Sequence, residues 1–312
     1  MAAWVSVLTL LVACSHQSLA SCAHGTHLHP RAELRVIEAP KFGYIATKGP
    51  ANWFSLDPQT NALCGHGKHQ SPINMEKGSF DLIPASELKI DIPDFTAGAE
   101  FENLGTTVEV VAEGLGGKMT LDDTSYSLQQ FHFHLPSEHL DNGTSMAMEM
   151  HMVWTSEEDE IAVIGVYIDL YDGFSAAQHQ GEAAGRKALR DHRQVNATTP
   201  SAVVATVLGS VDKIATLGDV THTEPLAMSE LVSHLSSGSF QSYSGSLTTP
   251  PCSEGVKWLV SNKKVSISTS TYLKARSVIG YNARFPQNAP GQENLLDLYA
   301  ESAEVYRAVL VQ

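Results

Sequence analysis

The amino-acid sequence predicts a mixed α+β domain that is dominated by β-strands and organised around one large sheet. From about residue 41 to 287, short runs of β-branched and aromatic residues alternate with Gly, Pro, Asn and Asp, which is the pattern of many short strands joined by turns. Helical periodicity is confined to two segments. The chain has 312 residues, and no internal repeat or long low-complexity linker divides it, so we expect a single domain.

Five runs carry the strand signal most clearly, and they are Thr106–Val111, Leu128–Leu135, Met148–Trp154, Glu160–Ile168 and Val256–Val260. Apolar residues at helical spacing predict one amphipathic helix over Ser201–Leu217 and another over residues 293–312. The segment 172–200 is polar and short of aromatic residues. We interpret it as a surface insertion in the domain.

The first 20 residues resemble a secretory signal peptide. They carry no charged side chain, contain the apolar run Trp4–Ala13, and end with small residues at Ser18 and Ala20. The apolar run is too short to span a bilayer, and no later segment reaches that length. We therefore expect a secreted, extracellular protein with a leader at 1–20 and a flexible lead-in at 21–40; cleavage after Ala23 is the alternative.

In an exported protein, cysteines can form disulfides and N-x-[ST] sequons can carry glycans. Cys64 and Cys252 are the cysteine pair within the domain, and in an oxidising compartment such a pair is expected to form a disulfide; the alternative is two buried free thiols. Cys22 would be an odd thiol beside the cleavage site. Asn142 and Asn196 begin N-x-[ST] triplets and are candidate N-glycosylation sites.

The charge balance excludes some classes of partner. Acidic residues outnumber basic ones by 34 to 20, which gives a formal net charge of −14. Such a chain is not expected to bind nucleic acid or to dock on an anionic membrane. The one macromolecular partner that we consider is a second copy of the chain, in a homodimer.

Three histidines on two predicted strands indicate a metal site. Successive side chains of a strand point to opposite faces of a sheet, so His132 and His134 share one face of the run Leu128–Leu135. His151 lies on the run Met148–Trp154. Three imidazoles from two adjacent strands can converge on one point. Three neutral nitrogen ligands with a fourth position open are typical of a catalytic zinc site.

Polar neighbours on the same strand faces favour this interpretation. Gln130 precedes His132 by two residues, and Glu149 precedes His151 by two. Each is placed to accept the second ring N–H of its histidine, as partners of metal ligands do. The alternative is a set of hydrogen-bonded core histidines. That alternative is less favoured, because several imidazoles in one apolar patch would each need a partner there.

Blocks of residues across most of the chain resemble the α-class carbonic anhydrases. The resemblance covers roughly residues 42–282, with a gap at the insertion, and the blocks follow the order and spacing of the family. They are F-G-Y from Phe42 with Trp53, H-Q-S-P-I-N from His69, F-H-F-H from Phe131, S-E-H from Ser137, E-M-H-M-V from Glu149, Y-S-G-S-L-T-T-P-P from Tyr243, W-L-V from Trp258 and N-A-R from Asn282.

The resemblance implies a fold and a reaction. The fold is one α-carbonic anhydrase domain over residues 41–292, built on a large, mostly antiparallel, twisted sheet with short peripheral helices and followed by a helical extension over 293–312. Cys64 and Cys252 match the disulfide positions of exported members. The reaction is the reversible hydration of carbon dioxide to bicarbonate and a proton, by attack of zinc-bound hydroxide in an enzyme that requires Zn²⁺.

The resemblance also implies roles for single residues. The zinc ligands are matched by His132, His134 and His151, and the residues around them by Gln130, Glu149 and Tyr44. Asn282 matches the residue near which a backbone carbonyl accepts from the second ligand, His134. The apolar wall that holds carbon dioxide is matched by Val153, Val163, Leu247, Val256 and Trp258.

Three further residues match the catalytic groups. In the family arrangement the hydroxyl of Thr248 donates to the carboxylate of Glu138, so that the hydroxyl oxygen must accept from the attacking hydroxide and aims it at the substrate. The backbone N–H of Thr248 is expected to meet a substrate oxygen. Thr249 lines the polar side of the site.

One position departs from the family pattern. N-L-G-T from Asn103 aligns with the family's N-x-G-H, which puts Thr106 where fast members carry a proton-shuttle histidine. Threonine has no useful pKa near neutrality, whereas histidine does. We therefore expect slower export of the proton, or export through another histidine or through buffer.

Rival functions remain to be separated by experiment. A zinc-dependent esterase would use the same hydroxide on an activated ester. A non-catalytic carbonic-anhydrase-like binding protein would be expected to lack ligand histidines, but here all three are present. Metal scavenging through the histidines that follow His24 is the third alternative, and 14 histidines in the whole chain are too few to indicate it.

Overall fold

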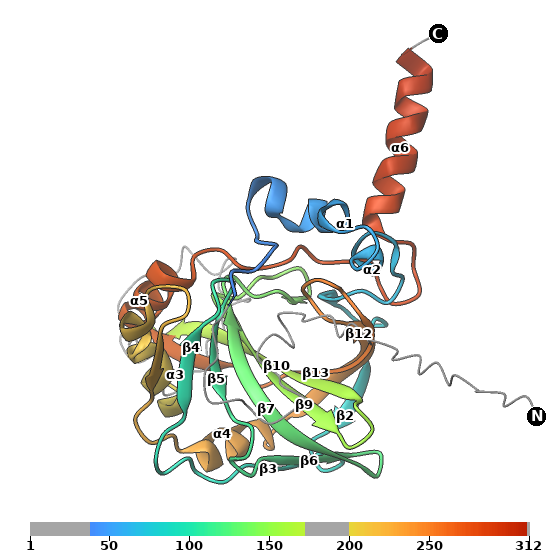
Figure 1. Ribbon diagram of the computed structural model, residues 1–312. Coiled ribbons are helices and arrows are strands. Elements are labelled where there is room, and N and C mark those ends of the chain that lie inside the picture. Colours follow the sequence, from blue (N-terminus) through green and yellow to red (C-terminus); the bar gives the residue numbers. More distant parts are fainter. Residues whose placement is uncertain (1–37, 172–199, 311–312) are drawn as a thin grey trace, which may run out of the picture.

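The computed structural model describes residues 38–171 and 200–310, with side chains up to residue 303 (Figure 1). The predicted leader, all but the last three residues of the predicted lead-in, Cys22, Asn196 and nearly all of the predicted insertion lie outside the described residues.

A sheet of 12 strands forms the body of the molecule (Figure 1). Its main path runs β11-β4-β5-β7-β9-β10-β13-β12-β2; β14 pairs with β10, while β6 pairs with β7 and with β3. The strands are β2 (Asp81–Pro84), β3 (Lys89–Asp91), β4 (Glu100–Asn103), β5 (Val108–Val111), β6 (Lys118–Leu121), β7 (Thr124–His134), β9 (Met148–Ser156), β10 (Ile161–Tyr171), β11 (Val220–His222), β12 (Ser239–Ser246), β13 (Glu254–Ser261) and β14 (Val265–Ser268). A separate two-stranded sheet pairs β1 (Asn74–Met75) with β8 (Leu140–Asp141).

Most neighbouring strands of the large sheet are antiparallel, as predicted. The exceptions are β13 and β14, which both run parallel to β10. The predicted fold class, a single β-dominated α+β domain, is therefore confirmed.

The helices are short and lie at the periphery of the sheet, except for the last one. They are α1 (Trp53–Leu56), α2 (Ala62–His66), α3 (Ala202–Gly209), α4 (Met228–Leu235), α5 (Thr269–Ile279) and α6 (Leu295–Leu310), with 3₁₀ turns η1 (Ala46–Lys48), η2 (Pro50–Asn52) and η5 (Val211–Ile214). The described residues contain no helix that is long and apolar enough to cross a membrane.

The prediction of one continuous helix over Ser201–Leu217 is wrong in its length. Helix α3 ends at Gly209, and the separate turn η5 follows it. Between them the hydroxyl of Ser210 donates to the carbonyl of Thr206 at 3.3 Å. Glycine and serine are poor residues for a helix interior, so the apolar spacing continues while the regular helix stops.

The two faces of the central strands have different surroundings. Phe131 and Phe133 of β7 and Met150 and Met152 of β9 are buried in the main apolar core, together with the inner sides of α3, α4 and α5. The alternate residues of the same strands, including the histidines, face the other way. Strand periodicity therefore separates the face that packs in the main core from the face that carries the histidines, as the sequence predicts.

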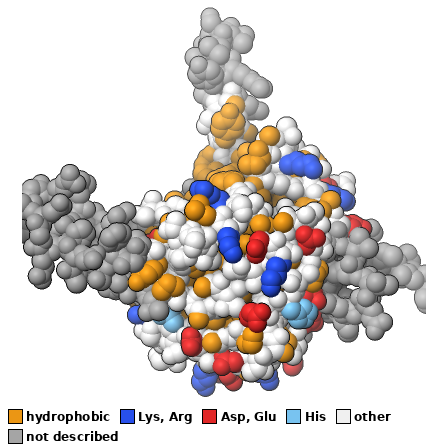
Figure 2. Space-filling view, turned by 90° about the vertical axis from the view of Figure 1, so that its left-hand side faces the viewer, with side chains coloured by type: hydrophobic (Ala, Val, Ile, Leu, Met, Phe, Trp, Pro, Cys, Tyr) orange, Lys and Arg blue, Asp and Glu red, His pale blue; other side chains and the backbone are white. Residues whose placement is uncertain are grey.

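The predicted C-terminal helix is α6, which stands away from the sheet (Figure 1). It meets α2 at its first turn, where Nδ1 of His66 lies 2.7 Å from Oδ1 of Asp297. Figure 2 shows hydrophobic side chains gathered where this helix joins the body. Exposed apolar residues of α1, α2 and α6 are Leu56, Leu63, Leu298 and Tyr299.

The predicted disulfide is confirmed. Cys64 on α2 is bonded to Cys252, which lies in the turn between β12 and β13, and the bond joins positions 188 apart in the sequence. A disulfide of this kind persists in oxidising compartments and is rare in the cytosol.

Candidate metal centre

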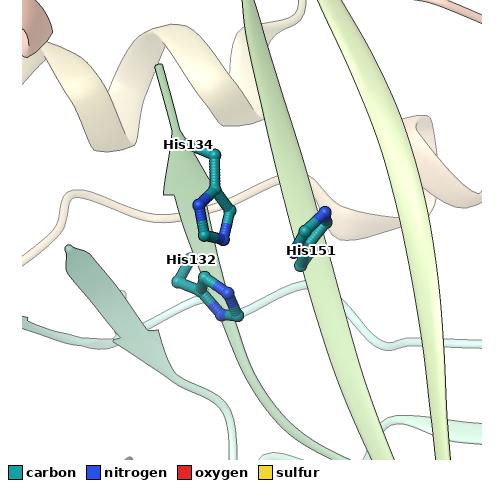
Figure 3. A group of neighbouring side chains, drawn as sticks. All are labelled: His132, His134 and His151. Carbon is teal, nitrogen blue, oxygen red and sulfur yellow. The ribbon is translucent and has the colours of Figure 1, made fainter. Parts of the chain in front are cut away.

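Three histidines converge on one point on the face of the sheet opposite the main core. His132 and His134 lie at the end of β7, and the antiparallel register places His151 of β9 directly opposite His132. Their rings turn toward one another across the two strands (Figure 3). One nitrogen from each ring lies within 4.8 Å of the other two, and each residue is at most 1% exposed.

Hydrogen bonds to protein oxygens decide which nitrogen of each ring faces the centre. Each ring donates one N–H to an oxygen: His132 Nδ1 to Gln130 Oε1 at 2.8 Å, His134 Nδ1 to the Asn282 carbonyl at 2.8 Å, and His151 Nε2 to Glu149 Oε1 at 2.9 Å. An oxygen of these kinds can only accept. The proton of a neutral ring must therefore sit on the bonded nitrogen, and the other nitrogen carries a lone pair.

The three remaining nitrogens have no partner among the described residues. They are Nε2 of His132, Nε2 of His134 and Nδ1 of His151, and all three atoms are buried. Leaving a buried polar atom unsatisfied costs about 1–3 kcal/mol. Three such lone pairs aimed at one place fit a metal ion, since neutral imidazole nitrogens are preferred ligands of transition metals.

The protonation states of the histidines agree with metal binding. Burial lowers the pKa of the His132 and His151 rings, and it lowers the pKa of His134 to about 4. All three rings are therefore neutral at pH 7, which is the form that binds metal.

Glu149 is held as a carboxylate beside one of the candidate ligands. Besides the N–H of His151, it accepts the ring Nδ1–H of His139 at 2.7 Å and the backbone N–H of His139 at 2.8 Å. Burial raises the pKa of the Glu149 carboxyl, but His139 and His151 act in the opposite direction, and the pKa lies well below its ordinary value. The resulting negative charge makes His151 a stronger base toward a metal.

A second buried acid lies on the other side of the histidines. Oε1 of Glu138 accepts the backbone N–H of Arg284 at 2.8 Å, and Oε2 lies 3.9 Å from Nδ1 of His151. Burial raises the pKa of Glu138 to about 7, while His151, the Arg284 N–H and a hydrogen bond from the side chain of Thr248 act to lower it. The hydroxyl of Thr248 therefore contacts the acid with which the family resemblance pairs it.

The predicted apolar wall forms one cluster. Val153, Val163, Leu247, Val256 and Trp258 are all buried in the same group of apolar side chains. The Trp258 ring centroid is 4.8 Å from that of His151, so this cluster borders the metal centre. Thr249 is buried, and it follows Thr248 directly.

The other predicted residues lie outside the cluster of three histidines. Thr106 is 5% exposed, and its carbonyl accepts from the side-chain amide of Asn282 at 3.0 Å. Tyr44 packs in an aromatic cluster with Phe42 and Trp53. Asn142 is exposed in a turn after β8.

Sequence reasoning assigned no role to two residues that support the site. His139 fixes Glu149, and its other ring nitrogen lies 2.7 Å from the hydroxyl of Tyr243. Arg284 holds Glu138 through its backbone. Both belong to motifs noted in the sequence, S-E-H and N-A-R. Each block contains at least one polar residue beyond those to which the resemblance gives a role. Such an extra polar residue is the signal in the sequence that could have identified them.

A twisted 12-stranded sheet that carries three buried, converging histidines defines a protein with a metal-ligand set of the catalytic type. Residues 48–295 match the family model of eukaryotic-type carbonic anhydrase, and the chain belongs to that family. Both the family and the enzyme class that the sequence predicts are confirmed.

Individual relatives agree with this assignment. Alpha carbonic anhydrase 6 of Arabidopsis thaliana is 34% identical over 217 residues, which cover 69% of this chain and 70% of the relative. A carbonic anhydrase of Neisseria gonorrhoeae is 30% identical over 253 residues, 80% of each chain. The solved structure of the fungal alpha carbonic anhydrase from Aspergillus oryzae superposes with a TM-score of 0.71 at 35% identity, covering 84% of this chain and 99% of the other.

Proposed function

We propose that this protein is a zinc enzyme that hydrates carbon dioxide reversibly to bicarbonate and a proton. The observation that carries the proposal is the set of three buried nitrogens on His132, His134 and His151, each with its other ring nitrogen bonded to an oxygen. Family membership supports the reaction.

The three histidines would hold Zn²⁺, and Gln130, Glu149 and the Asn282 carbonyl would keep their rings in place. Zinc supplies a Lewis acid that lowers the pKa of a water molecule and makes it a nucleophile near neutral pH. The neutral rings leave the full positive charge of the ion available for this purpose. The carboxylate of Glu149 adjusts that charge through His151.

Thr248 and Glu138 would orient the nucleophile. A hydroxyl has one proton to donate and lone pairs that accept. When the proton of Thr248 is donated to an ionised Glu138, its oxygen can only accept, and this selects one orientation of a neighbouring O–H group. A positive ion among the histidines would favour the ionised form of Glu138, against the effect of burial.

The apolar cluster would accommodate the substrate. Carbon dioxide carries no charge, so a surface of valine, leucine and tryptophan side chains beside the nucleophile suits it. Bicarbonate is an anion and is poorly accommodated by such a surface, which favours its release. Thr249 would provide a polar edge to the site.

We also propose that the protein is exported. The disulfide agrees with an oxidising compartment, and the uncharged first 20 residues resemble a leader. Asn142, exposed in its turn, is our candidate for an N-linked glycan.

The test is carbon dioxide hydration by the purified zinc-loaded protein, before and after removal of zinc with a chelator. We expect activity that is lost on chelation, regained with zinc, and absent in His132→Ala; His222→Ala, an exposed histidine on β11, is the matched control. Full activity in His132→Ala would contradict the mechanism. Ester hydrolysis without carbon dioxide hydration would favour the esterase instead, and zinc binding without either activity would favour a binding protein.

A further inference from the structure

We infer that Gln70 is a positioning residue for the catalytic pair: its buried side chain joins the turn that carries Thr248 to the residue that anchors Glu138. This inference rests on the proposed function. Gln70 belongs to the H-Q-S-P-I-N block and touches none of the three candidate metal ligands in the contacts described for it.

Both ends of the Gln70 amide are used in contacts with distant parts of the chain. Its Nε2 donates to the carbonyl of Cys252 at 3.0 Å and to Oε1 of Glu254 at 3.1 Å. Its Oε1 accepts from Nη1 of Arg284 at 3.0 Å. The side chain is 2% exposed, and a Cβ placed on Gly67 would collide with its amide. The amide therefore has little freedom to adopt another position.

The contact with Arg284 leads to Glu138. The guanidinium of Arg284 also donates to the carbonyls of Ser71 at 2.7 Å and Cys64 at 3.3 Å. The backbone N–H of the same residue donates to Oε1 of Glu138 at 2.8 Å. Because the side chain and the backbone of one residue make these contacts, a shift of the guanidinium changes the place of the N–H that holds Glu138.

The contact with Cys252 leads to Thr248. The turn after β12 is closed by two backbone hydrogen bonds, from Cys252 N–H to the Thr249 carbonyl at 2.8 Å and from Leu247 N–H to the Ser253 carbonyl at 2.9 Å. Thr248 lies inside that closed turn. The turn is attached to the body through the Cys252 side chain by the disulfide and through the Cys252 carbonyl by Gln70.

Gln70 therefore contacts the supports of both members of the pair. The hydrogen bond between Thr248 and Glu138 depends on the relative position of two segments that are remote in sequence, and this single side chain spans their supports. A displacement of catalytic groups by about 1 Å can cost about 100-fold in rate. Loss of the bridge should therefore reduce turnover without removing a metal ligand.

The experiment compares two variants with a matched control. Gln70→Met keeps the length of the side chain but removes all three hydrogen bonds, and Gln70→Glu keeps the acceptor for Arg284 but loses the donor to Cys252. The control is Asn294→Leu, which removes another buried amide of the same region, whose Nδ2 donates to the Gly67 carbonyl at 3.0 Å. The control residue touches neither Arg284 nor the Thr248 turn in its described contacts.

Three quantities are measured for each protein: kcat/KM for carbon dioxide hydration, bound zinc per chain, and hydrogen exchange of the Arg284 and Cys252 amides. We expect kcat/KM to fall about 10- to 100-fold in Gln70→Met and less in Gln70→Glu, with zinc content unchanged. The two amides should exchange faster in Gln70→Met than in the control, because Gln70 holds the two residues that carry them, Arg284 and Cys252. Asn294→Leu should keep kcat/KM within about twofold while its stability falls.

Unchanged kcat/KM in folded Gln70→Met overturns the inference. So does an equal loss of activity in Asn294→Leu, because the effect would then follow general stability. If the unmodified protein does not hydrate carbon dioxide, the proposed function fails instead, and the exchange rates alone decide whether Gln70 holds the two supports. Should Gln70→Met fail to fold, Gln70→Glu provides the same comparison.

Discussion

His151 and Glu149 are joined through Nε2 and Oε1 at 2.9 Å, so His151 presents Nδ1 to the metal centre, whereas His132 and His134 present Nε2. The carboxylate therefore selects the tautomer of this ligand. Both residues lie on β9 two positions apart, and the strand itself fixes the pair.

Replacing the carboxylate should weaken metal binding. In Glu149→Gln one carbonyl oxygen must serve the donors that now share two carboxylate oxygens, and the negative charge is lost. We expect the zinc Kd to rise about 10- to 100-fold, the range known for partners of metal-bound histidines, carbonic anhydrase among them. Competition with a chromophoric chelator measures it. Glu224→Gln, at an exposed site, is the control, and equal affinities in the two variants would show that Glu149 does not support the ligand.

The metal-free protein should lose stability as the pH falls below about 6.5. The three histidines have folded pKa values lowered by burial from an ordinary value of 6.5, so the unfolded chain takes up protons there that the folded chain does not. For each such proton, the free energy of unfolding falls by about 1.4 kcal/mol per pH unit. Glu138, whose pKa is raised to about 7, acts in the opposite direction and roughly offsets His134. The net loss should come from His132 and His151.

Below about pH 4.5 a further loss is expected from Glu149. Its folded pKa is lowered from 4.5, so its stabilising effect is present above that pH and disappears as the carboxylate is protonated. Urea unfolding in the presence of a chelator measures both losses of stability. The first phase is the loss between pH 7.5 and 5, and the second phase is the loss below pH 4.5. His132→Asn should flatten the first phase and His222→Asn should not; a first phase that is flat in the unmodified protein would refute the assignment of neutral histidines.

Proton export should limit turnover at low buffer concentration. The family resemblance aligns Thr106 with the position of the proton-shuttle histidine, and Thr106 is 5% exposed. We expect kcat to rise with buffer concentration in the unmodified protein, and Thr106→His to raise kcat several-fold at low buffer with kcat/KM little changed, because histidine titrates near neutrality. Thr106→Val is the control of similar shape. Turnover that is independent of buffer, together with no gain in Thr106→His, would exclude this interpretation.

Loss of the disulfide should destabilise the fold. The chain-entropy model gives about 5 kcal/mol for a closure of this length, as an upper value that depends on the model. Replacing both cysteines, as Cys64→Ser with Cys252→Ser, avoids a reactive free thiol. We expect a lower urea midpoint in the double variant and in the reduced protein, and the same midpoint in both. A double variant as stable as the oxidised protein would show that the bond adds no stability.

A glycan at Asn142 should appear when the chain is secreted from a host that glycosylates. Asn142 is exposed in a tight turn, where its backbone N–H donates to the Met75 carbonyl at 3.2 Å. We expect a mass increase that glycosidase treatment removes. Thr144→Ala breaks the sequon and should abolish that part of the increase, whereas Thr198→Ala reports separately on Asn196. An identical mass in Thr144→Ala would rule out modification at this site.

Local periodicity was enough to predict the metal centre and two of its supports, Gln130 and Glu149, while the supports from distant segments required the folded chain. The period of two along β7 and β9 places His132 beside Gln130 and His151 beside Glu149, since both partners lie within the same strand. No such rule links His139 to Tyr243 or Arg284 to Glu138, because those contacts depend on how loops remote in sequence pack. The break of α3 at Gly209 was missed because apolar spacing continues through it and masks two weak helix formers.

The bond between Cys64 and Cys252 closes a covalent ring that contains all three candidate ligands as well as Glu138 and Thr248. A single cut at any peptide bond between the two cysteines leaves both fragments attached to each other. An oxidised protein nicked once in this interval therefore keeps its full set of site residues in one molecule. When the nick lies between His132 and Thr248, reduction and unfolding separate these residues into two fragments. If the protein is exported, as proposed, this ring would hold the site together after a single cleavage by an extracellular protease.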